Sequence, residues 1–146
     1  MKFIKQNIGW DAEPNAPMPS LEVARTGDSI KISFYLNSFI HDDVTEEDKG
    51  ILQFMNCYKY RLGPTNDEGF YSGKCRFSKT GMDWGNFYMI EESNWKSDFP
   101  SDEKIINSNL VHHPNLNHYL FYFRDETFEC IAESYRFHVL KEGFKD

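Results

Sequence analysis

Residues 21–36 read LEVARTGDSIKISFYL, and this stretch decides the fold class. In residues 30–36 an apolar side chain stands at every even position and alternates with more polar ones, which is the two-residue period of a half-buried strand. Gly27 opens the two-residue turn between the halves, and a glycine in that position is what a type II′ turn requires. The sequence therefore predicts an antiparallel hairpin in which Val23 lies opposite Ile32.

A second hairpin is predicted near the end of the chain, where residues 118–133 read HYLFYFRDETFECIAE. Pairing Phe123 with Phe128 aligns the two apolar runs. Both a two-residue and a four-residue loop give this pairing. We expect the longer loop, residues 124–127, because Asp and Glu are poorly suited to the positive φ angles of a type I′ turn. Farther along, the apolar positions change from even to odd near Ser134, which predicts a β-bulge there.

Three further strands are predicted between the hairpins, over residues 51–62, 70–78 and 86–92. On the first of them, the residues expected to share one mainly apolar face are Leu52, Phe54, Tyr58, Tyr60 and Leu62, with Asn56 interrupting it. Residues 93–117 follow no clear period, and a short helix over residues 102–108 is the expectation there.

The composition agrees with a sheet protein. Aromatic residues make up 16% of the chain, whereas only four of its 146 residues are alanine, the strongest helix former. We therefore predict an all-β fold, either an antiparallel β-sandwich or a curled, barrel-like sheet of about seven or eight strands with at most one short helix. Residues 1–146 are expected to form a single β-rich domain. The proline-rich segment 10–20 should be an extended arm that Trp10 pins onto this domain.

The formal net charge of −7 limits the partners that the protein can have. It opposes binding to nucleic acid and to anionic membranes, because both need Lys and Arg to replace counterions. It suits a partner protein with a basic surface. The three cysteines form neither a disulfide framework nor a zinc motif, and we expect neither a signal peptide nor a membrane span. We expect a cytoplasmic protein with free thiols and no cofactor.

The histidines are the candidates for chemistry. The expected register places His118 opposite Glu133, so the two could act as an acid–base pair in a cleft or form a polar pair on the sheet surface. His112, His113 and His118 are candidate metal ligands, although adjacent side chains on an extended segment point to opposite sides. Cys130 is expected to face the core, where burial keeps a thiol unreactive.

Two sets of residues are candidates for binding. Asn66, Asp67 and Glu68 lie in a turn-like sequence, where such side chains either bond their own backbone or meet a cation or a basic partner. Trp84 and Trp95 could contribute to an exposed stacking platform for a sugar or a protein, with burial in the core as the alternative.

Several segments share a resemblance. Residues 118–132, HYLFYFRDETFECIA, resemble a closing hairpin in small bacterial proteins of unassigned function, and PNAPMP at residues 14–19 and NDEG at residues 66–69 are similar to them as well. The resemblance implies a bacterial, stand-alone domain, and it implies no catalytic residues. Small acidic bacterial proteins of this kind sometimes act as immunity partners of toxins, which is an association and not a mechanism.

Two functions are therefore predicted, in order. The first is a non-enzymatic protein-binding module of a bacterium, with neutralisation of a basic toxin as its immunity-like form, that uses exposed aromatic residues and acidic loops such as residues 42–50. The alternative is a small-molecule binder or hydrolase with a cleft around His118 and Glu133. The sequence contains neither a Gly-x-Ser-x-Gly elbow nor a phosphate-binding loop, which favours the first.

Overall fold

The computed structural model describes residues 1–10, 22–38, 40–64, 77, 80, 82–83, 85–123 and 126–141. Its strands are β1 (Lys2–Lys5), β2 (Glu22–Thr26), β3 (Ser29–Tyr35), β4 (Lys49–Gly63), β5 (Phe87–Glu91), β6 (Lys104–Ile105), β7 (Asn117–Tyr122) and β8 (Thr127–Leu140). One short 3₁₀ helix, η1, spans Ser108–His112. Within this part of the chain, no helix is both long enough and apolar enough to cross a membrane. The all-β prediction is confirmed.

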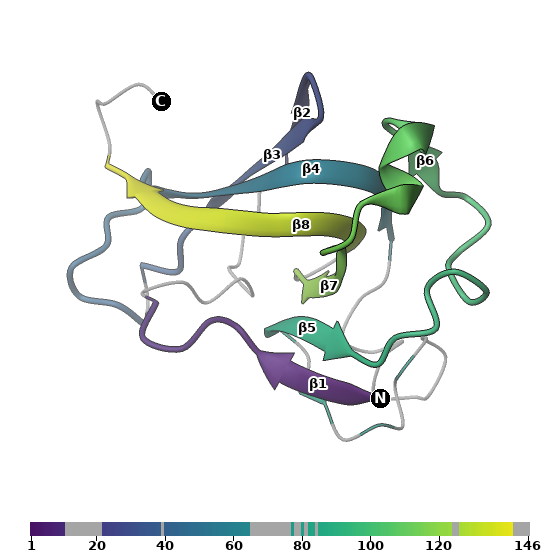
Figure 1. Cartoon of the computed structure of the whole chain (residues 1–146). Coiled ribbons are helices and arrows are strands. Elements are labelled where there is room, and N and C mark those ends of the chain that lie inside the picture. Colours follow the sequence, from purple (N-terminus) through teal and green to yellow (C-terminus); the bar gives the residue numbers. More distant parts are fainter. Residues whose placement is uncertain are drawn as a thin grey trace.

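All eight strands belong to one antiparallel sheet, which Figure 1 shows. The order across the sheet is β1-β5-β7-β8-β4-β3-β2, and the short β6 pairs with β4 beside this path. The end strands β1 and β2 do not pair with each other, so the sheet formed by the described residues is open and is not a closed barrel. Of the two predicted architectures, the described strands form the single curled sheet.

The sheet curls until strands that are distant in its order face each other. The ring centroids of Phe34 in β3 and Phe87 in β5 lie 5.8 Å apart, although β4, β8 and β7 separate the two strands. In Figure 1, β5 and β1 lie below the long β4–β8 pair. The Trp10 indole joins the two parts, because it contacts both Phe87 and Phe137 of β8. The predicted pinning by Trp10 is thus confirmed, whereas residues 11–20 of the predicted arm lie outside the described residues.

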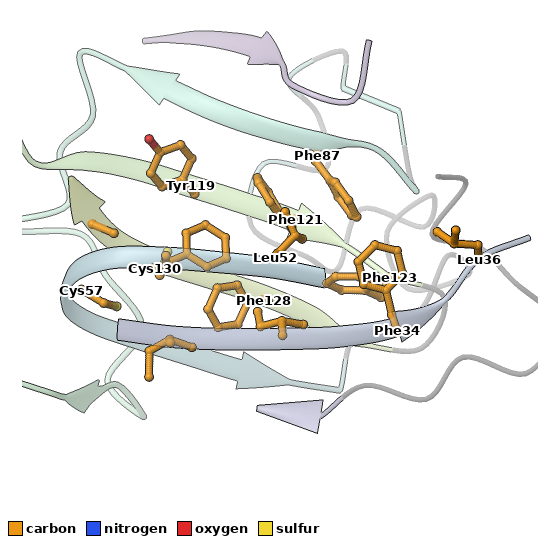
Figure 2. Packing of buried hydrophobic residues seen from close by; sticks show 14 of the residues in the cluster. Phe34, Leu36, Leu52, Cys57, Phe87, Tyr119, Phe121, Phe123, Phe128 and Cys130 are labelled. Atoms are coloured by element: carbon orange, nitrogen blue, oxygen red, sulfur yellow. The ribbon is translucent and has the colours of Figure 1, made fainter. Parts of the chain in front are cut away.

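The inside of this curl holds the main hydrophobic core. Figure 2 shows how the side chains of Phe34, Phe87, Phe121 and Phe128 gather there from four different strands. All four rings are buried. Burying an aromatic side chain of this size stabilises the folded state by about 1.5–3 kcal/mol, so these rings favour the curled shape of the sheet.

The hairpin predicted from residues 21–36 is confirmed by the strand register. Val23 of β2 lies opposite Ile32 of β3. Gly27 has a φ of 59°, the left-handed value that the first position of a type II′ turn needs. Ile32 is fully buried, so the turn chemistry and the apolar period agree here.

The predicted register of the last hairpin is wrong by two residues. Phe128 of β8 lies opposite Phe121 of β7 and not opposite Phe123. The Phe123 N–H donates to the Glu126 carbonyl, so the connecting loop has two residues instead of the four that we expected. A shift of two keeps every side chain on the same face of the sheet, and the apolar pattern therefore fits both registers equally well.

The long pair formed by β4 and β8 changes its core-facing positions midway. In β8 the core residues stand at even positions as far as Ala132 and at odd positions from Tyr135 onward, which confirms the change predicted near Ser134. The register shift itself lies on the partner strand β4, between Cys57 and Lys59. The bulge thus belongs to the strand opposite the one for which we predicted it.

This irregularity turns one residue of the predicted apolar face out of the core. Asn56 has a φ of 48°, a left-handed value that reorients the strand just before the register shift. Cys57 consequently takes the buried core position in place of Tyr58. Tyr58 instead packs against Trp95, with ring centroids 5.9 Å apart.

The helix predicted over residues 102–108 is wrong. Lys104–Ile105 form β6, because their backbone pairs with Lys59 and Tyr60 of β4 in place of closing a helical turn. The helical turn comes later, as η1, and the Asn107 side chain caps it by accepting the Asn109 N–H. The strand predicted over residues 86–92 is confirmed as β5, whereas nearly all of the strand predicted over residues 70–78 lies outside the described residues.

Both faces of β7 are covered. Tyr119 and Phe121 belong to the main core, while Leu120 and Tyr122 belong to a second buried cluster on the other side. A strand with two apolar faces needs cover on both, and the protein itself supplies it here.

Candidate functional site

His118 lies in β7 and is almost completely buried. Its cross-strand neighbour is Ile131, so the predicted pairing of His118 with Glu133 is wrong. The carboxylate that contacts His118 belongs to Glu129 of β8. Glu129 lies two residues from Ile131 and thus diagonally across the strand pair from His118, on the same face of the sheet. The His118 Nε2 atom lies 2.5 Å from Glu129 Oε2, and both side chains are at most 2% exposed. The imidazole therefore has a buried carboxylate partner of a kind that we expected, but a different residue supplies it.

Ser93 occupies the other side of the same ring. Its Oγ lies 2.5 Å from His118 Nδ1, and it also accepts the Trp95 N–H at 3.1 Å. With Glu129 ionised, Nε2 must carry a proton, because a carboxylate only accepts. Nδ1 of the neutral imidazole then accepts from the Ser93 hydroxyl. Ser93, His118 and Glu129 thus form a hydrogen-bonded Ser–His–Glu cluster.

The backbone before this serine is strained. Ser93 comes two residues after the end of β5, and Glu92 between them has a φ of 56°. This left-handed value is uncommon for a residue other than glycine. The turn that follows is closed by the Asp98 N–H, which donates to the Asn94 carbonyl at 2.7 Å. Strand end, strained residue and turn together hold the Ser93 hydroxyl against the imidazole.

A lysine and several aromatic rings lie beside the Ser–His–Glu cluster. The Lys59 Nζ is 2.8 Å from Glu103 Oε2, and its side chain is only 8% exposed. The Phe99 ring lies close to both Lys59 and His118. Its centroid is 4.5 Å from the Lys59 Nζ and 5.9 Å from the His118 ring centroid. The rings of Tyr58 and Trp95 also contact this ammonium. The buried charge is thus balanced by one carboxylate and by the faces of aromatic rings.

The predicted metal ligands do not come together. His112 is exposed on η1, while His113 Nε2 lies 2.9 Å from Glu133 Oε2. His118 has Ser93 and Glu129 as its partners. Within the described part of the chain, no three His, Cys, Asp or Glu side chains are arranged to hold a metal ion. The geometry of the described residues therefore gives the metal hypothesis no support.

Of the predicted binding residues, the structure describes Trp95 alone. Asn66, Asp67, Glu68 and Trp84 lie outside the described residues. Trp95 is half-buried, and it packs on Tyr58 and on lysines instead of presenting an open face.

Cys130 faces the core, as predicted, although its neighbour across the hairpin is Tyr119. It is fully buried, and burial raises the pKa of its thiol well above the ordinary value. The neighbouring Cys57 acts in the same direction on this pKa. Both cysteines are free thiols. Cys130 is thus a core side chain and not a nucleophile.

Residues 40–48 form an acidic loop. Asp42, Asp43, Glu46 and Glu47 are exposed, and Ile40, at the start of the same segment, is 60% exposed. Apolar and acidic side chains thus stand together on one short segment.

Two buried residues hold the acidic loop in place. Val44 is 6% exposed and belongs to the main core. Asp48 is 1% exposed, and its Oδ2 accepts the Thr45 N–H at 2.9 Å and the Lys141 Nζ at 3.1 Å. Lys141 also donates to the Asp43 carbonyl. The loop backbone is therefore fixed from inside the fold and from the end of β8.

Comparison of the chain with protein-family models, with curated proteins and with solved structures found no match. The resemblance of the closing hairpin to small bacterial proteins stays a prediction. Function is therefore inferred from the side chains of this protein alone.

Proposed function

We propose that this protein is a binding module and that its acidic loop, residues 40–48, docks on a basic surface of another protein. The observation that supports this proposal is that an anchored backbone presents an exposed isoleucine and four exposed carboxylates on one short segment. An apolar centre with a charged rim is the usual composition of a protein–protein contact. The carboxylates steer a basic partner towards the loop, and Ile40 loses water when the partner arrives.

Anchoring supports the proposal because it lowers the entropic cost of binding. A free loop would have to be ordered by its partner, and fixing the backbone of each residue costs about 1–2 kcal/mol. Val44 and Asp48 have already ordered the loop backbone in the folded protein. The net charge of −7 acts in the same direction over a longer range.

A matched pair of charge-reversed proteins tests this proposal. The loop variant carries Asp42→Lys, Glu46→Lys and Glu47→Lys. The control carries Glu22→Lys, Asp83→Lys and Glu91→Lys, which change the net charge equally at exposed positions elsewhere. Proteins that the wild type captures from a bacterial lysate would be quantified at low and at high salt.

We expect a basic protein that the wild type and the control retain, and that the loop variant loses at least tenfold. High salt should weaken the same interaction, because exposed charges are screened. Identical capture by the two variants would reject the acidic loop as the binding surface.

The immunity-like form of the proposal makes a narrower prediction. The partner would be a basic toxin of a bacterium, and co-expression with this protein would restore growth. The loop variant would fail to restore growth, while the control would succeed. Rescue by both variants would separate immunity from the acidic loop and so contradict this form.

A further inference from the structure

We propose that Ser93 is a nucleophile activated by His118 and Glu129, and that it accepts the acyl group of small carboxylic esters. This activity is independent of the acidic loop. The three side chains come from the segment after β5, from β7 and from β8, so the curled sheet brings together residues that are distant in sequence. A serine hydroxyl on one nitrogen of an imidazole, with a carboxylate on the other, is the arrangement by which serine hydrolases activate their nucleophile.

The hydrogen bonds assign a role to each group. The Glu129 carboxylate holds the proton on Nε2, so Nδ1 is the free base that faces the Ser93 hydroxyl at 2.5 Å. Because Ser93 Oγ already accepts the Trp95 N–H, its own proton points to Nδ1. Glu129 is buried beside the ring and would stabilise the imidazolium that forms when the proton moves.

Exposure differs along the cluster in the way that nucleophilic catalysis needs. His118 and Glu129 are about 1% exposed, which keeps water away from the base and its carboxylate. Ser93 is partly exposed and so forms the accessible end of the cluster. The strained Glu92 backbone holds this serine in position, and strain of this kind is often found at functional sites.

The reaction can be written with every atom accounted for. Ser93 Oγ bonds to the ester carbonyl carbon while its proton passes to His118 Nδ1. The ester C–O bond then breaks, and the leaving phenoxide takes that proton, which leaves an acyl-Ser93. Water attacks the acyl carbon, gives its proton to Nδ1 and releases the carboxylic acid as Ser93 recovers the proton. Glu129 stays a carboxylate throughout.

The Phe99 ring packs on the His118 ring and so favours a small apolar acyl or aryl group. We therefore name small aryl esters as the substrate class, with p-nitrophenyl acetate as the probe for turnover and an alkyl fluorophosphonate as the probe for the nucleophile.

The experiment compares the wild-type protein with Ser93→Ala, Glu129→Gln and Ser97→Ala. Ser97 lies on the same turn, is exposed, and its hydroxyl donates to the turn carbonyl of Asn94, so its variant is the matched control. We expect wild type and Ser97→Ala to release p-nitrophenol at the same rate, and Ser93→Ala and Glu129→Gln to be at least tenfold slower. Peptide mapping should locate the fluorophosphonate on Ser93.

A second variant keeps the test informative should Glu129→Gln fail to fold. Ser93→Cys, made in a Cys75→Ser background, should react with iodoacetamide at least tenfold faster than Ser97→Cys in the same background. The imidazole would take the thiol proton and leave a thiolate. Equal rates for the two cysteines, a label on a residue other than Ser93, or full activity of Ser93→Ala would each overturn the proposal and leave the Ser–His–Glu cluster as a structural element.

Discussion

The indole of Trp10 stacks on the ring of Phe137, with centroids 4.3 Å apart and planes inclined by 5°. The same indole meets the edge of Phe87 at 5.9 Å. Phe137 belongs to β8 and Phe87 to β5, so one residue from the N-terminal segment joins two parts of the curled sheet that have β7 between them.

Replacing Trp10 by alanine should destabilise the protein by about 2–4 kcal/mol, because the stacked indole is lost and its place stays largely empty. Urea unfolding followed by circular dichroism measures this difference. Ile8→Ala is the control, since Ile8 is 73% exposed, and it should change stability by less than about 0.5 kcal/mol. Equal stabilities for the two variants would contradict the closing role of Trp10.

Two glycines of β4 should respond differently to alanine. A Cβ at Gly50 would lie 2.6 Å from the Phe34 Cζ, in a ring that is itself buried in the core. The atoms nearest to a Cβ at Gly63 would be those of the Arg61 guanidinium, which is the end of a flexible side chain and not part of the core. We expect Gly50→Ala to cost about 1–3 kcal/mol and Gly63→Ala less than about 1 kcal/mol, as measured by urea unfolding. A larger cost at Gly63 would contradict this reading of the packing.

The two core cysteines should be unreactive until the protein unfolds. Cys57 and Cys130 are both fully buried, and burial raises the pKa of Cys130. In a Cys75→Ser variant, a disulfide reagent such as DTNB at pH 8 should therefore modify neither thiol on the timescale in which it modifies both in urea. Fast modification in native buffer would show that the core opens around these residues.

The stability of the protein should fall at high pH because of Tyr135. Burial raises the pKa of this phenol from 10.0 to about 12 in the folded protein. Between these values the unfolded chain loses a proton that the folded protein keeps, so the free energy of unfolding falls as pH rises from 10 towards 12. Urea unfolding at pH 9 and at pH 11.5 tests this prediction, with absorbance at 295 nm reporting the phenolate. Tyr135→Phe should show a smaller fall, and an equal fall would assign the effect to other groups such as Tyr119, whose pKa burial also raises.

The hairpins show what could and could not be predicted from the sequence. Gly27 allows only a few turn types, so the register that places Val23 opposite Ile32 followed from turn chemistry and apolar period together. In the last hairpin, apolar side chains stand on both faces and phenylalanine occurs at positions 121, 123 and 128. A shift of two residues leaves such a pattern unchanged. The predicted register therefore depended on a preference for a four-residue loop, which tertiary packing overrides.

The Ser–His–Glu cluster was missed for the same reason. With the observed register, Glu129 is diagonal to His118 on one face of the sheet, within reach of a long side chain. Ser93 could not have been found in this way, because residues 93–117 follow neither the helix nor the strand period. Its position depends on the strained turn after β5, which leaves no signal in the sequence.

The pairing of β4 with β8 has a consequence for how the protein folds. Residues near position 50 bond to residues near position 140, and Gly63 at the other end bonds to Thr127. This pairing closes a very long loop. The chain therefore loses conformational entropy before the contacts between β4 and β8 can stabilise the fold. During synthesis, β3 and β4 cannot complete their part of the sheet until β8 has left the ribosome. Folding is expected to take milliseconds to seconds instead of microseconds.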